Sequence, residues 1–138
     1  MRITATERKT KENLDYSKID PECVNLCKAI NEIPGIWTFE SCCRHGEDEY
    51  MILFFVTDLN NLSLLLSCIH GRDDWAVKVY AVYYGIAPKY ILEGPVGDFK
   101  TAERIAREMR REWTLVQNEK EERRKCQKTK EPVKLRLQ

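Results

Sequence analysis

The chain has 138 residues, of which 43% are hydrophobic and 33% are charged, and its net charge is +1. This length suits one domain with a proper core, and no stretch approaches the ~20 apolar residues of a membrane-spanning helix. The N-terminus also lacks the apolar segment of a signal peptide, so we expect a cytoplasmic protein without a membrane partner. Because cytoplasmic thiols stay reduced, its six cysteines should be buried, metal-binding or reactive rather than disulfide-bonded.

The charges are distributed unevenly along the chain. Residues 1–99 contain 10 basic and 15 acidic residues, a net charge of −5, whereas residues 100–138 contain 13 and 7, a net charge of +6. A basic C-terminal third can attract a phosphate-bearing ligand, a nucleic acid or an acidic partner. The alternative is a solvated helix on which the interspersed acids form ion pairs.

The first predicted element is a helix that follows a polar arm. Residues 1–19 show no sustained period and are expected to form a flexible N-terminal arm. Asp20 and Pro21 predict a helix start, since aspartate is a good N-cap and proline suits the first turn. An apolar stripe at helical spacing reaches Ile33, and Pro34 with the glycine after it ends the helix.

Two strands and a second helix come next. The strands are predicted over residues 36–41 and 50–57, with a polar loop over residues 42–49. The second strand is apolar on both faces, which is typical of a central strand covered on both sides. Asp58 is expected to cap a helix whose apolar stripe reaches Ile69.

The same order of elements then recurs. Residues 75–84 alternate as a strand, and residues 90–93 predict a fourth strand. The order helix, hairpin, helix, hairpin, helix predicts an α+β fold with an antiparallel four-stranded sheet in a doubled helix-hairpin arrangement. We assign residues 20–118 to this α+β domain.

The last predicted helix is the longest. It follows Asp98, and its apolar stripe ends at Val116. Residues 119–138 are expected to form a basic helical extension and tail that projects into solvent or meets a partner. Residues 130–138 alternate at their end, so this tail can add a strand to a neighbouring chain. We expect a homo-oligomer.

Both histidines of the chain lie in a short internal repeat. Residues 43–50 and 68–75 each read Cys-x-His-Gly-x-Asp-acid-aromatic. Four of these side chains have the composition of a tetrahedral zinc site, although a Cys-x-His pair leaves little room to chelate one ion. In the alternative, the second cysteine packs on the apolar edge of its helix and the histidine after it lies at the helix C-terminus. The candidate metal ligands are Cys43, His45, Cys68 and His70.

Residues 40–46, Glu-Ser-Cys-Cys-Arg-His-Gly, concentrate reactive side chains in one loop. In a catalytic interpretation, Cys42 or Cys43 is a thiolate whose pKa is lowered by Arg44 or His45. No third residue that would orient such a pair is evident. In a structural interpretation, the cysteines are buried and the arginine pairs with a nearby glutamate.

In a third interpretation this loop binds an anion. Arg44, His45 and the backbone N–H groups of a glycine-containing turn can hold a phosphate, with the Ser41 hydroxyl as a further donor. Arginines that share a face of the last helix can line the same kind of groove. The candidate ligand-binding residues are Ser41, Cys42, Arg44, His45, Arg104, Arg107 and Arg111. Aromatic side chains available to stack on a base are Trp37, Tyr50, Trp75, Tyr83, Tyr84 and Tyr90.

Residues 31–42 resemble the helix-to-strand segment of the wybutosine-synthesis tRNA methyltransferase family. That family has an asparagine after a helix and then a Thr…Ser-Ser-Cys-Ser-Gly-Arg loop. Ser41 and Cys42 match the loop, whereas residues 43–46, Cys-Arg-His-Gly, depart from it. The resemblance implies an RNA-modifying enzyme that uses S-adenosylmethionine and loses activity when Cys42 is replaced by serine.

Residues 40–46 and 93–97 are similar to a family of small bacterial and phage proteins. Those proteins have a Glu-Ser-Cys-Cys-x-His-Gly loop and a later Glu-Gly-Pro-x-Gly turn, and both are present here. The resemblance covers most of the domain and implies kinship of fold and a phage or prophage setting, hence a bacterial host cell. It implies no reaction.

These observations lead to three hypotheses of function. The first is a non-enzymatic module that binds a small phosphate-bearing ligand such as a nucleotide. In a phage setting this would suit a sponge that sequesters a nucleotide immune signal. The second is an RNA-modifying enzyme like the methyltransferases above. The third is a zinc-stabilised interaction protein, which would lose its fold with a chelator.

Overall fold

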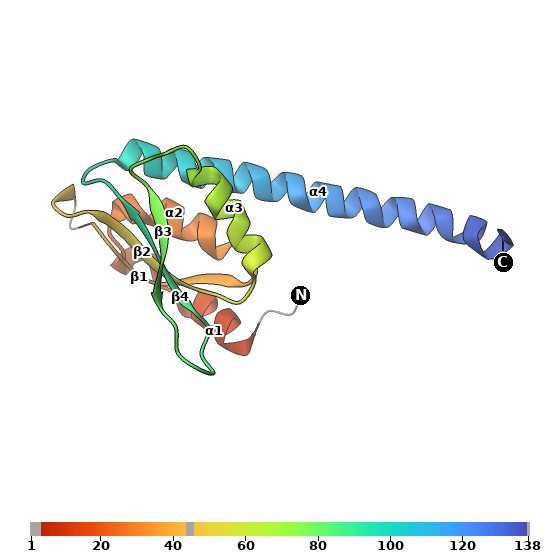
Figure 1. Cartoon of the computed structure of the whole chain (residues 1–138), viewed down its shortest axis with the longest axis horizontal. Coiled ribbons are helices and arrows are strands. Elements are labelled where there is room, and N and C mark those ends of the chain that lie inside the picture. The colour runs from red at the N-terminus through yellow and green to blue at the C-terminus, as the bar shows by residue number, and fades with distance from the viewer. Residues whose placement is uncertain (1–3, 44–45, 138) are drawn as a thin grey trace.

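The computed structural model describes residues 4–43 and 46–137, with side chains described up to residue 127. Helices alternate along the chain with pairs of strands, and the four strands form one sheet (Figure 1). The helices are α1 (Ala5–Asn13), α2 (Pro21–Asn31), α3 (Leu59–Ile69) and α4 (Phe99–Leu137), with a short 3₁₀ helix η1 (Tyr16–Lys18). The strands are β1 (Ile36–Cys42), β2 (Tyr50–Val56), β3 (Ala76–Ala81) and β4 (Lys89–Gly94).

The sheet is antiparallel throughout and has the order β1-β2-β4-β3. Each helix-hairpin unit therefore contributes one edge strand and one central strand. The two central strands pair over their whole length, from Tyr50 opposite Gly94 to Phe55 opposite Lys89. The predicted α+β fold, with its doubled helix-hairpin order and long last helix, is confirmed.

The core lies between one face of the sheet and helices α2, α3 and α4. Alternate residues of β2 point into it because successive strand side chains face opposite ways. The predicted apolar stripes of the three helices supply the other side of the core. Its fully buried members include Ile52, Phe54, Leu92, Leu26, Ile30, Leu65, Ile105 and Met109.

Residues 5–13 form helix α1, which differs from the flexible arm expected over residues 1–19. The carboxylate of Glu7 is buried and accepts the backbone N–H of Gly35 at 3.0 and 3.2 Å. Lys11 donates to the same carboxylate at 2.8 Å and to the carbonyl of Ile33 at 2.9 Å. An ion pair and hydrogen bonds anchor this helix, and such contacts leave no apolar period in the sequence.

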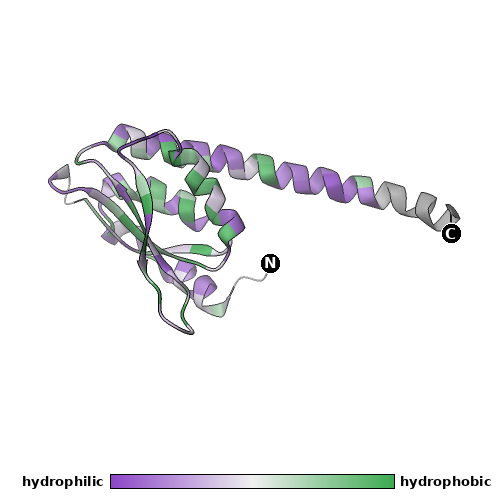
Figure 2. Ribbon diagram, viewed as in Figure 1, coloured by the Kyte–Doolittle hydropathy of each residue, from purple (hydrophilic) through white to green (hydrophobic). Residues whose placement is uncertain are grey.

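Helix α4 continues through Leu137, so residues 130–137 are helical and do not form the predicted tail strand. In a helix most backbone groups pair within the helix, so residues 130–137 do not offer the row of free groups with which a strand joins a sheet. Trp113 and Val116 are the last half-buried residues, and residues 117–127 are exposed, as the end of the apolar stripe predicted. The part of α4 that extends beyond the sheet is mostly hydrophilic (Figure 2). Within the described ranges, no helix combines the length and the apolarity needed to cross a bilayer.

Candidate functional site

The loop between β1 and β2 contains the densest group of predicted site residues. Arg44 and His45 lie outside the described residues. Cys43 and Gly46 frame them: the N–H groups of Gly46 and Asp48 donate to the Cys43 carbonyl at 2.9 and 3.2 Å. Gly46 has a φ of 92°, a conformation that costs glycine little and other residues more. The N–H groups of Gly46 and Asp48 are therefore already paired within the loop and are not free to hold a phosphate.

Ser41 and Cys42, two predicted ligand-binding residues, point to opposite faces of the sheet. Ser41 pairs with Ile52, which is buried under the helices, and Cys42 pairs with Met51 on the other face. The Ser41 hydroxyl lies near the thiol of Cys27. Burial raises the pKa of this thiol to about 11, while hydrogen bonds from Ser41 and a nearby threonine act in the opposite direction. These two predicted residues therefore do not belong to one site.

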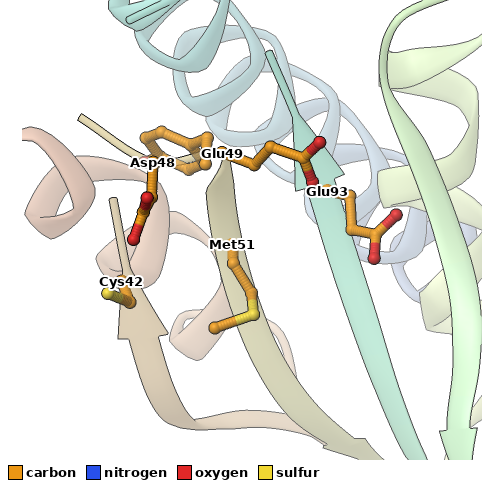
Figure 3. A pocket seen from close by; sticks show the side chains of 6 residues that line it. Cys42, Asp48, Glu49, Met51 and Glu93 are labelled. Carbon is orange, nitrogen blue, oxygen red and sulfur yellow. The ribbon is translucent and has the colours of Figure 1, made fainter. Parts of the chain in front are cut away.

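Cys42 lines an acidic pocket of about 340 Å³. Three carboxylates from the start of β2 and the end of β4 surround it together with the thiol, as Figure 3 shows. The lining residues are Cys42, Asp48, Glu49, Tyr50, Met51 and Glu93. Because its described lining contains acids and no base, this pocket repels a phosphate.

Cys43 is fully buried beside the start of α2. Its N–H donates to Oδ2 of Asp20 at 3.1 Å, and its Sγ lies 3.5 Å from the same oxygen. Asp20 occupies the predicted N-cap position, yet its carboxylate makes no bond to the first turn of the helix. It ties the loop to α2 instead. A buried thiol in contact with a carboxylate is poorly placed to act as a nucleophile.

The predicted zinc ligands are not brought together in the part of the chain that the structure describes. Cys68 is buried on α3, where burial raises the pKa of its thiol, and His70 follows that helix as an exposed C-cap residue. Among the described residues no group of three or more histidine, cysteine and acidic side chains could hold a metal. The fourth predicted ligand, His45, lies outside the described residues.

The two copies of the internal repeat occupy different positions in the fold. Residues 43–50 connect β1 to β2, whereas residues 68–75 connect α3 to β3. Their final aromatic residues meet: the rings of Tyr50 and Trp75 are 5.3 Å apart. Nε1 of Trp75 donates to Asp98 at 3.0 Å, and this bond is the main cause of the lowered pKa of that carboxyl. The repeat thus marks a packing contact next to the start of α4.

A basic groove of about 510 Å³ lies along the first turns of α4. It is lined by Phe99, Lys100, Glu103, Arg104 and Arg107. The groove begins beside the β1–β2 loop, because a Cβ atom on Gly46 would lie only 3.2 Å from Cζ of Phe99. The loop thus lies beside Phe99 at the start of the groove, and two of the three predicted arginines line the groove further along the helix. Arg111 shares their exposed helix face but does not line the groove.

Three residues that line the groove, Phe99, Lys100 and Glu103, were not predicted from the sequence as site residues. Lys100 precedes Arg104 by four positions and therefore lies on the same helix face, a spacing that could have revealed it. Phe99 gave no such signal, because its contact with the loop is long-range. Of the aromatic residues proposed to stack on a base, Trp37, Tyr50 and Trp75 are buried in the fold and cannot serve. Tyr83 and Tyr84 are exposed on the β3–β4 hairpin.

Comparisons of the chain with models of known protein families, with curated proteins and with solved structures find no match.

Proposed function

We propose that the chain is a non-enzymatic binding module for a small phosphate-bearing ligand such as a nucleotide, held in the basic groove of α4. The closeness of Gly46 to Phe99, where an added Cβ atom would lie 3.2 Å from the ring, supports this proposal. It joins two segments that the sequence marks separately, the loop at residues 40–46 and the arginines of the last helix. A ligand in the groove lies within reach of both.

The charge of the groove favours an anion. Lys100, Arg104 and Arg107 supply three cations against one acid, Glu103. That acid is already engaged, since Oε2 of Glu103 accepts from the side-chain amide of Asn25 at 2.9 Å. Arginine can donate two parallel hydrogen bonds to a phosphate, and such charge-assisted bonds contribute about 1.5–3 kcal/mol each.

The ligand is expected to be bound by side chains rather than by the N-terminus of α4. Oδ1 of Asp98 accepts the N–H of Thr101 at 3.3 Å, so a carboxylate already occupies the position in which a helix start holds an anion. Phe99, partly buried against the core, offers an apolar floor beside the basic side chains. This combination suits a ligand with an apolar base and an anionic end.

The biological role that we propose is sequestration. In the phage setting implied by the resemblance of residues 40–46 and 93–97, a module that binds a nucleotide without converting it would remove an immune signal from the host cell. Such a ligand is recovered unchanged when the protein is denatured, whereas an enzyme returns a product.

Isothermal titration with three probes, inorganic phosphate, ATP and a cyclic dinucleotide, tests the site. We expect Arg104→Ala and Arg107→Ala each to weaken binding of the best probe at least about 10-fold, the equivalent of ~1.4 kcal/mol. Arg111→Ala is the matched control, an exposed arginine on the same face outside the groove, and should change affinity by less than about 2-fold. Arg44→Ala tests the loop in the same assay.

Three results would count against the proposal. Failure of all three probes to bind would remove its ligand class. Equal losses in the Arg111→Ala and Arg104→Ala variants would show a diffuse charge effect rather than a site. Native and denaturing mass spectra of the protein purified from cells add an independent check, because release of a zinc ion instead of an organic ligand would favour the zinc hypothesis.

A further inference from the structure

The hairpin between β3 and β4 carries a run of exposed apolar side chains, on both of its faces, that the proposed site does not use. Residues 79–86, Val-Tyr-Ala-Val-Tyr-Tyr-Gly-Ile, contain no charged side chain and are called the hairpin patch below. Its six large apolar residues are between 56% and 106% exposed. They are Val79, Tyr80, Val82, Tyr83, Tyr84 and Ile86. Figure 1 shows the hairpin extending past the end of the sheet, away from α3 and α4.

The hairpin patch is exposed because the helices cover only part of β3. Val77 and Val79 lie on one face, opposite Leu92 and Tyr90 of β4, yet only Val77 packs against the core. Val79 remains 62% exposed. A face that would be buried in a central strand is therefore left open here.

The outer edge of the sheet at β3 lacks most of the features that prevent edge strands of different molecules from pairing. Edge strands of monomeric proteins are usually blunted by charges, prolines or bulges. Lys78 is the only charge of β3, and it is paired with Glu93 at 2.9 Å. A register shift between Val79 and Ala81 breaks the pairing with β4 once, but the apolar residues continue beyond it. Exposed apolar patches of several hundred Å² usually mark an interaction site.

We propose that the hairpin patch is the contact surface of a homodimer, in which two copies pack hairpin against hairpin about a twofold axis. The six side chains expose roughly 700 Å² in one protomer over the two faces of the hairpin. About 1,400 Å² is therefore the upper limit of what the dimer can bury, and stable interfaces bury roughly 1,200–2,000 Å². An antiparallel contact between identical edges is self-complementary, which a twofold dimer requires.

The absence of charge in the hairpin patch favours a second copy over a charged partner. Around a twofold axis each side chain meets the same chemical surface, so a charged patch would repel itself. Residues 79–86 offer no charge to an acidic or basic partner. The Lys89 ammonium beside them lies over the rings of Tyr83, Phe39 and Phe55, at 5.5–5.8 Å from their centres. The same surface also leaves the basic groove of α4 free, so dimer formation and ligand binding are independent.

Sedimentation equilibrium of the full chain tests the dimer. We expect a mass of twice 16.3 kDa for the wild type at micromolar concentration. The double variant Val82→Glu/Tyr84→Glu should raise the dimer dissociation constant at least about 100-fold, because four carboxylates then meet at the axis. Leu59→Glu is the matched control: Leu59 is 67% exposed on α3, and its replacement should leave the dimer intact.

Cysteine cross-linking reports on the same contact without adding charge. In a Cys42→Ser/Cys126→Ser background, which removes the two cysteines that are not buried, single cysteines replace Val79, Tyr80, Val82 and Tyr84 in turn. Paired strands bring opposite residues close enough for a disulfide only near the axis. We expect one position to cross-link much faster than the others.

Several outcomes would overturn the proposal. A wild-type monomer at all accessible concentrations would do so, as would a dimer that survives the double variant. A dimer that is lost on removal of residues 119–138 but not in the double variant would place the interface on α4. Circular dichroism of each variant shows whether the fold is retained, and the cross-linking series decides the question if the double variant does not fold.

Discussion

Replacing Gly94 with alanine is expected to destabilise the fold through a single steric contact. A Cβ atom at this position would lie 2.5–2.6 Å from three atoms of the Trp75 indole, well inside the normal contact distance. The backbone at Gly94 does not have a positive φ, so alanine brings no conformational strain of its own. The cost therefore comes from the ring.

Trp75 has little freedom to move away. Its Nε1 is held by Asp98 at 3.0 Å, its ring packs on Tyr50 at 5.3 Å, and the side chain is 5% exposed. Overpacking a close-packed region costs about 1–3 kcal/mol, and a rigidly held ring places Gly94→Ala near the upper end of that range. For a chain of this size, 2–3 kcal/mol corresponds to a fall in Tm of about 6–12 °C.

The assay is urea unfolding followed by circular dichroism, analysed as a double-mutant cycle with Trp75→Phe. The smaller ring removes the indole atoms that the new Cβ meets. Trp75→Phe alone also lowers stability, because it loses the bond to Asp98. The loss of unfolding free energy in the double variant should nevertheless be at least about 1 kcal/mol smaller than the sum of the losses in the two single variants. Gly97→Ala is the control, since its φ is 74° and nothing lies within 4 Å of the added atom.

Additive free energies in the Gly94–Trp75 cycle would refute this reasoning. So would a loss below about 0.5 kcal/mol for Gly94→Ala, which is the range of ordinary surface substitutions. The Gly97→Ala effect should be additive with Trp75→Phe, because that cost arises from the backbone alone.

Three further predictions concern other parts of the fold. Glu7→Ala should lower the unfolding free energy measured in urea by about 3 kcal/mol, because it leaves the N–H of Gly35 buried without its acceptor. Amide hydrogens of α1 should then exchange faster. A loss below about 1 kcal/mol would contradict the anchoring role of the carboxylate. Burial raises the pKa of the Cys27 thiol from 9.0 to about 11, so the folded state favours the neutral thiol. Its contribution to stability is complete below pH 9 and is lost as the pH rises through 11. Thermal melting should therefore show a loss of about 2–3 kcal/mol across that window, and a smaller loss in Cys27→Ala. Gly46 has a φ of 92°, and a Cβ atom added there would lie 3.2 Å from Cζ of Phe99. Gly46→Ala should therefore move the loop away from α4 and weaken binding in the titration assay. Unchanged affinity would show that the loop does not contribute to binding in the groove.

The sequence predicts those parts of the fold that depend on apolar periodicity. The stripes of α2 and α4 supply core residues as expected, whereas Leu59 and Leu66 of the predicted α3 stripe are 67% and 41% exposed. In β2, Ile52 and Phe54 enter the core, while Met51 and Phe55 on the other face are half-buried. Helix α1 was missed because its anchor is the buried Glu7 carboxylate, a single long-range contact with no period. The tail was misjudged for the opposite reason: three alternating apolar residues mimic a strand, while the helix that precedes them continues through Leu137.

In the candidate site, closeness in the sequence does not determine closeness in space. Ser41 and Cys42 are adjacent, yet the alternation of a strand sends them to opposite faces. Gly46 and Phe99 are far apart in the sequence, yet a Cβ atom added to Gly46 would lie only 3.2 Å from the Phe99 ring. The first relation was not evident because the predicted strand ended at Ser41, whereas β1 continues through Cys42. The second depends on how the last helix packs, which no local pattern reports.

The acidic residues 1–99 and the basic residues 100–138 each contribute a surface near the β1–β2 loop. On one side the acidic pocket presents Asp48, Glu49 and Glu93, and on the other the first turns of α4 present Lys100 and the two groove arginines. Screening limits such fields to about 8 Å at physiological salt, so each surface acts mainly on what lies within it. A ligand bound beside Gly46 would therefore experience a steep change of potential across its length. Its anionic end would be directed to α4, which is why the proposed phosphate site is the basic groove rather than the acidic pocket beside Cys42.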